Sequence, residues 1–416
     1  MSTHECADVF QAIGDEVART WARTGFRDED FPAIATDVLA RAAVARHVSA
    51  RDVLRYVIET PTLPFQQNDG SRFGEPPVGV YWHPRFYVEA LFWLTGTATA
   101  HNHAFAGAFA VLDGQCIHTE YAFTLEEEHP DEIAFGAIAL TDSALHATGH
   151  VETIEPGDAF VHAVFHVGRP SASLVVRTHS KSVGAGRQYI PPGLRVGPAF
   201  EDQLSRRRLQ ALGLLLQLAS ADYESAARQV MDAGGLRTAF NVLQQLTDLA
   251  PLSPMRAPIV AHATTRWGAS IDRIERALAV QQRQRLGMMA RRRVQRSDDL
   301  LLLGLLLLEE NWRAIGDRLR QWAMAGSADE AAAWLAAGLD RLAACGAWGV
   351  ALDADVRQAV IASAREAVAE RASDAREPAP VPVPVQGQVQ GQGPRRAHAD
   401  ILIGPFCART SEPVVS

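Results

Sequence analysis

The first sixty residues carry apolar side chains at helical spacing. On one face of the first predicted helix lie Val9, Ile13, Val17 and Trp21. Ser49 and Asp52 have the spacing of a capping box, which predicts the start of a further helix. Pro61 ends the pattern, because proline cannot continue a helix interior. We therefore predict a helical region from residue 7 to about 60.

From about residue 78 the helical pattern gives way to short runs of aromatic and β-branched residues, which favour strands. Turn-forming pairs, among them Asp113-Gly114 and Pro156-Gly157, separate these runs. The predicted strands cover 78–82, 86–94, 99–112, 115–123, 134–140, 150–154, 159–167 and 172–179. Seven or eight short strands at this spacing predict a sandwich or a barrel.

Beyond Pro191 the chain returns to helical spacing and keeps it to about Arg371. Residues 377–416 are rich in Pro, Gln and Gly, a composition that cannot bury a core. We therefore predict an α+β fold in four parts. They are a helical N-terminal region at 1–75, a β-rich domain at 76–185, an α-helical domain at 200–375 and a disordered tail at 376–416.

Composition and charge narrow the class of protein. The chain has 416 residues, more than one ordinary core, and it is 47% hydrophobic. A net charge of -8 gives no reason to expect nucleic acid as a partner. The four cysteines show neither CxxC nor framework spacing, which favours a reducing compartment. The start lacks a signal-peptide pattern and no apolar run is long enough for a membrane span, so we expect a cytoplasmic protein without a membrane partner.

Histidines gather in the strand-rich segment, where ten of the 14 lie between 83 and 179. In His101-Asn102-His103 the two imidazoles face the same way, because strand residues two apart share a face. The later strand offers His162 and His166, which also share a face. A third imidazole from this strand would complete a facial triad and leave coordination positions open for substrate and dioxygen.

These runs resemble the cupin superfamily, and within it the three-histidine thiol dioxygenases typified by cysteine dioxygenase. The first motif is similar to residues 96–103 continuing to Gly114, and the second to Pro156-Gly157-Asp158 followed by His166 and 173–176. The resemblance covers about residues 80–180 and implies a cupin-like β-barrel. It also implies that His101, His103 and His166 are the metal ligands.

Departures from the family pattern narrow the expected chemistry. Many cupins carry a glutamate four or five residues after the second histidine, where this chain has Gly107 and Ala108. The missing carboxylate favours the three-histidine subset. Ala108 also stands where some thiol dioxygenases have a cysteine cross-linked to tyrosine, so that cross-link is excluded. Arg177 falls near the place of the family's frequent active-site tyrosine.

Three neutral imidazoles would leave Fe(II) its full positive charge and attract a thiolate. A mechanism that uses 2-oxoglutarate would require HxD or HxE, which is absent from the motif. We predict a mononuclear non-heme Fe(II) oxygenase that oxidises a small thiol or amino-acid-like substrate with O2. Zn, Ni or Mn stay open as metals, and a lyase or isomerase reaction is then the alternative. A non-enzymatic sensor or binding protein is the third hypothesis.

Three further residues are candidates for the catalytic site. Arg85 or Arg177 would clamp a substrate carboxylate through paired hydrogen bonds, although Arg85 equally fits a surface position at a strand edge. His162 competes with His166 as the third ligand and otherwise fits a substrate contact on the same face. The sequence predicts neither the substrate nor the oligomeric state.

Overall fold

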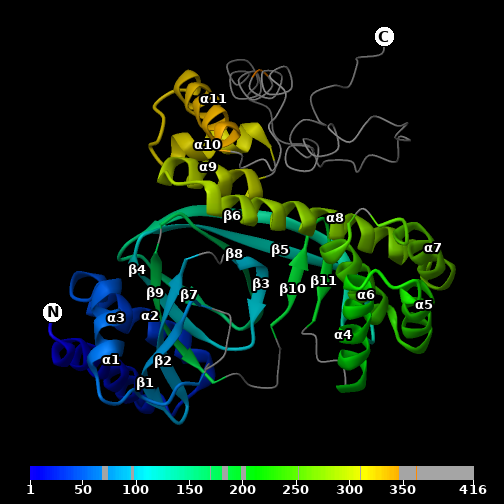
Figure 1. Ribbon diagram of the computed structural model, residues 1–416. Coiled ribbons are helices and arrows are strands. Elements are labelled where there is room, and N and C mark those ends of the chain that lie inside the picture. Colours follow the sequence, from blue (N-terminus) through cyan, green and yellow to red (C-terminus); the bar gives the residue numbers. More distant parts are fainter. Residues whose placement is uncertain are drawn as a thin grey trace. The chain divides into compact units, whose positions relative to one another are not determined.

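The computed structural model describes residues 1–67, 74–94, 98–168, 170–179, 186–197, 203–251, 253–309, 311–345 and 362. The chain forms two compact units, Met1–Gln282 and Arg283–Ser416 (Figure 1). None of the helices in the described ranges is long and apolar enough to cross a bilayer.

Three helices open the first unit: α1 (Thr3–Arg23), α2 (Phe31–Ala42) and α3 (Ala50–Glu59), with short 3-10 turns at Asp28–Asp30 and Val44–Arg46. Ser49 and Asp52 form the capping box that the sequence predicts, and Ser2 and Glu5 form another at the start of α1. The apolar faces of these helices share one core with a β-sheet.

That sheet has five antiparallel strands in the order β1-β2-β9-β4-β7. Its strands are β1 (Pro77–His83), β2 (Phe86–Trp93), β4 (Gly107–Asp113), β7 (Val151–Ile154) and β9 (Ser171–Thr178). Every residue of β2 is buried. Its side chains alternate, so that Val88 and Phe92 join the core with the helices while Leu91 and Trp93 join a second core cluster. The sheet is therefore covered on both faces.

The other six strands close into a barrel in the order β10-β11-β6-β5-β8-β3. They are β3 (Ala98–His103), β5 (Gln115–His129), β6 (Ile133–Ala147), β8 (Gly157–His166), β10 (Gln188–Ile190) and β11 (Leu194–Val196). A long hairpin joins β5 to β6. Both β3 and β5 pair with β8, so β8 is the central strand around which the site is built.

Helices α4 (Gln203–Gln217), α5 (Tyr223–Ala233), α6 (Leu236–Leu249), α7 (Arg256–Trp267) and α8 (Ala269–Ala290) follow the barrel. Their apolar side chains share a core with barrel residues such as Ile133, Phe135 and Leu194. An ion pair of 2.6 Å between Arg273 of α8 and Glu126 of β5 adds to this packing. The described part of α4–α7 therefore belongs to the same unit as the barrel.

The second unit holds the last turns of α8, a 3-10 turn at Arg291–Arg293, and helices α9 (Ser297–Leu308), α10 (Trp312–Gln321) and α11 (Ala328–Ala344). Most residues of α9 are buried, which explains its nearly unbroken run of leucines. Two carboxylates with little exposure are paired: Asp299 with Arg341 at 2.7 Å and Glu309 with Arg318 at 3.2 Å.

The predicted fold class is confirmed: the chain has an α+β fold with a closed cupin-like barrel between helical segments. The compact units, however, divide at residues 282 and 283, inside α8, whereas the sequence predicts a boundary between 185 and 200. The physical reason is the core that α4–α8 share with the barrel strands. The predicted tail at 376–416 lies outside the described residues.

Candidate metal centre

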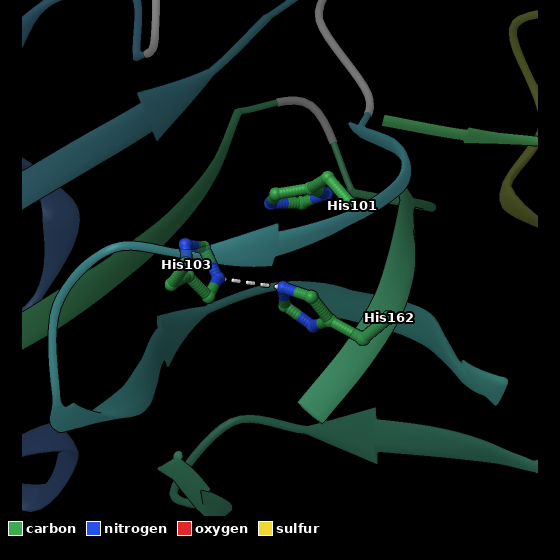
Figure 2. A group of neighbouring side chains, drawn as sticks. All are labelled: His101, His103 and His162. Carbon is green, nitrogen blue, oxygen red and sulfur yellow. Dashed lines mark hydrogen bonds between the residues drawn. The ribbon is translucent and has the colours of Figure 1, made fainter. Parts of the chain in front are cut away.

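Three histidines from two neighbouring strands point toward one another, with His103 and His162 buried and His101 part-buried (Figure 2). His101 and His103 come from β3, and His162 of β8 is the register partner of His101. One ligand nitrogen of each lies within 4.8 Å of the others. Nε2 of His103 lies 2.8 Å from Nε2 of His162. Strand alternation places the side chains of His101 and His103 on one face of β3, as the sequence predicts.

Asn102, the residue between His101 and His103, anchors β3 through hydrogen bonds on the opposite face of the strand. Asn102 is 2% exposed, and its amide nitrogen donates to Asp158 at 2.7 Å and lies 3.1 Å from the hydroxyl of Tyr189. Its carbonyl oxygen accepts from the backbone N–H of Arg187 at 2.6 Å. Because these hydrogen bonds hold Asn102 on one face of β3, His101 and His103 are fixed on the opposite face.

The donor set of these histidines fits a divalent metal ion. Burial lowers the pKa of His101, and burial together with neighbouring imidazoles lowers the pKa of His103 and His162 well below the ordinary value. All three rings are therefore neutral at pH 7, and a neutral imidazole carries one nitrogen lone pair that can bind a metal ion. Two nitrogens bound side by side at about 2.1 Å from one ion lie roughly 3 Å apart. The observed 2.8 Å between His103 and His162 is close to that value.

The three histidines line a cavity of about 60 Å³ between the two sheets. Such a volume holds a few water molecules or a ligand with few heavy atoms. Most of its wall is apolar, with Trp93, Phe105 and Val175 among the lining residues. The polar lining residues besides the three histidines are Cys116, His166, Ser171, Ser173 and Arg177. A small ligand with an apolar body suits this space.

His166, the third ligand that the family resemblance implies, lines the same cavity but does not belong to the close group of three. Its ring stacks on Trp93 with the centroids 4.6 Å apart. Its Nδ1 lies 3.1 Å from the hydroxyl of Ser171. The structure therefore brings His162, the competing candidate, next to His101 and His103.

The two predicted arginines have different surroundings. Arg177 of β9 lines the cavity, with its guanidinium 4.1 Å from the ring centroid of Phe105 and 3.1 Å from the carboxylate of Glu89. Arg85 is exposed in the turn between β1 and β2, with its guanidinium over Phe26 at 4.6 Å. Only Arg177 of these two is among the described residues that line the cavity.

A second cluster contains residues that the sequence analysis left out of the site. His118 is 2% exposed and His146 is 6% exposed, and both lie near Glu152. Nε2 of His118 lies 2.8 Å from Nδ1 of His162. Strand alternation could have identified His118 from the sequence. His118 is two residues from the apolar Cys116, so both side chains share a strand face and point inward.

No protein-family model and no curated protein matches the sequence. Among solved structures, a hydroquinone 1,2-dioxygenase from Sphingomonas with 4-hydroxybenzoate bound is 14% identical over 26% of this chain and 68% of its own, with a TM-score of 0.20. A DMSP lyase from Ruegeria pomeroyi is 16% identical over 43% of this chain and 95% of its own, with a TM-score of 0.23.

A recombinant oxalate oxidase in complex with glycolate is 17% identical over 41% of this chain and 82% of its own, with a TM-score of 0.21. Similarities this weak assign no reaction, substrate or metal to this chain. The fold and the clustered histidines themselves define a cupin-like barrel protein with a group of side chains able to hold a metal ion.

Proposed function

We propose that the chain is a mononuclear non-heme iron oxygenase in which His101, His103 and His162 hold Fe(II), and that it oxidises a small thiol with O2. The observation that carries this proposal is the group of three neutral imidazoles at a cavity, two buried and one part-buried, each with one ligand nitrogen within 4.8 Å of the others. When bound, Fe(II) would supply Lewis acidity toward a thiolate and redox chemistry with O2.

The protein's own groups would prepare this site before any ligand arrives. The lowered pKa values of the three histidines keep their lone pairs available, since no proton must leave first. The link from Asn102 to Asp158 holds the β3 backbone in place. Trp93 and Phe105 exclude water from the cavity wall, which strengthens electrostatic interactions inside.

Arg177 would orient the substrate. Its guanidinium is held at the cavity by the Glu89 carboxylate and by the ring of Phe105. A guanidinium in this position can donate to a carboxylate on the substrate. The cavity is small, so we expect a substrate with few heavy atoms. Arg85 is not part of the proposal, because its side chain is exposed over Phe26.

The test is anaerobic loading with Fe(II), addition of nitric oxide and EPR spectroscopy, with cysteine, cysteamine and 3-mercaptopropionate as probes. We expect an iron-nitrosyl signal that changes with at least one thiol, and O2 uptake with that thiol. His162→Ala should lose the signal, whereas His166→Ala, a change on the same strand, should keep it. A protein that binds no Fe(II), or a signal unaffected by every thiol, would contradict the proposal; metal binding without O2 uptake would favour a lyase or isomerase.

A further inference from the structure

Three side chains beside the first group form a second arrangement of metal-ligand type. His118 of β5, His146 of β6 and Glu152 of β7 each place one ligand atom within 4.8 Å of the other two. They come from three strands, two in the barrel and one in the five-stranded sheet. Strand pairing therefore brings His118 to the segment that carries His146 and Glu152.

The contacts around Glu152 have the spacing of ligands on a common ion. Its Oε2 lies 3.2 Å from Nε2 of His146 and 3.1 Å from Nε2 of His150. The two imidazoles stack with their centroids 3.5 Å apart, so both nitrogens approach the same oxygen. Adjacent ligand atoms bound at about 2.1 Å from one ion are separated by roughly 3 Å. The contact with His150 is a hydrogen bond, so the group with metal-type geometry is His118, His146 and Glu152.

Nε2 of His146 supplies a second, independent observation. The side chain is 7% exposed, and this atom is buried with no hydrogen-bond partner among the described residues. It lies close to the Glu152 carboxylate, but the geometry is not that of a hydrogen bond. A buried nitrogen in this position is costly unless something binds it. A cation between His146 and Glu152 would satisfy both groups.

The charge states of the cluster also suit a cation. Burial acts to raise the pKa of Glu152, but His146 and His150 lower it below its ordinary value, so the carboxylate is ionised at neutral pH. One carboxylate with two imidazoles is a donor set that first-row divalent metals accept.

We propose that His118, His146 and Glu152 form a second binding site for a divalent transition-metal ion such as Zn(II). This site is separate from the three-histidine group, because His146 and Glu152 take no part in that group. The two groups touch through the 2.8 Å contact between His118 and His162. The inference does not rest on the proposed oxygenase activity.

The experiment counts Zn(II) ions per chain. The full chain is stripped with a chelator and titrated with Zn(II) against a chromophoric competitor. We expect two equivalents for the wild type and one for Glu152→Gln, which keeps the size of the side chain. The matched control is Glu155→Gln, an exposed position three residues further on, which should still bind two. His146→Gln is a second variant of the proposed site, and circular dichroism checks the fold of each.

His101→Ala separates this inference from the proposed function. If both sites exist, His101→Ala binds one equivalent of Zn(II). The double variant that also carries Glu152→Gln then binds none. A single wild-type equivalent that His101→Ala loses and Glu152→Gln keeps overturns the second site alone. A single wild-type equivalent that Glu152→Gln loses and His101→Ala keeps supports the second site and overturns the first. Two equivalents in folded Glu152→Gln and His146→Gln also overturn the inference.

Discussion

At the scale of single residues, the carboxylate of Asp158 joins four strands of the barrel. It accepts hydrogen bonds from Asn102 at 2.7 Å and from the Tyr189 hydroxyl at 2.6 Å, and Arg195 lies 3.1 Å from its other oxygen. Burial acts to raise the pKa of Asp158, but Tyr189, Arg187 and Arg195 lower it overall. The backbone that presents His101 and His103 thus depends on one ionised carboxylate.

We therefore expect Asp158→Asn to lower the free energy of unfolding at pH 7, by about 1 kcal/mol for a part-exposed charged hydrogen bond. Because the folded pKa lies below the unfolded one, the contribution is present above pH 3.8 and is lost as the pH falls through the folded pKa. We expect urea unfolding, measured from pH 7 to pH 2.5, to show that the difference in free energy of unfolding between wild type and variant closes below pH 3.8. Asp8→Asn, an exposed control on α1, should show no gap. A gap independent of pH would contradict this account.

At the scale of elements, the sequence predicts two of the three histidines in the candidate metal site and leaves the third open for a definite reason. Period-two alternation pairs His101 with His103, and this needs one strand only. His162 and His166 share a face of β8, but they are about 13 Å apart along a strand that rises 3.3 Å per residue. Register decides between them: His162 lies opposite His101, whereas His166 lies opposite Cys116. Strand register depends on pairing between distant segments, which one sequence does not reveal.

The close approach of β4 and β9 gives a prediction at the same scale. A Cβ on Gly107 would lie 2.1 Å from the carbonyl oxygen of Val176, so a side chain there must push the two strands apart. We expect Gly107→Ala to cost about 1–3 kcal/mol of stability, measured by urea unfolding. The control is Gly326→Ala, where the added Cβ meets only the flexible end of Glu330. Equal stability of the two variants would contradict the packing argument.

At the scale of the whole molecule, the sequence predicts the order of the helical and β-rich parts but not how they divide. Helical spacing identifies an apolar face without identifying the surface that covers it. The faces of α4–α7 and the first part of α8 are covered by barrel residues, including Ile133 and Phe135. The division into compact units consequently falls at Gln282, inside helix α8.

Two compact units should unfold in two steps, and Zn(II) should stabilise only one of them. A ligand stabilises the folded state that binds it, and both histidine groups lie within Met1–Gln282. Differential scanning calorimetry of the full chain should therefore show two transitions, with Zn(II) raising the temperature of one. Leu174→Ala, in the core of the first unit, should lower the transition that responds to Zn(II), and Leu302→Ala, in the second, should lower the other. Each substitution should cost about 2–5 kcal/mol, because both side chains are fully buried. A single cooperative transition, or a Zn(II) response in the transition that Leu302→Ala lowers, would show that the two units do not unfold independently.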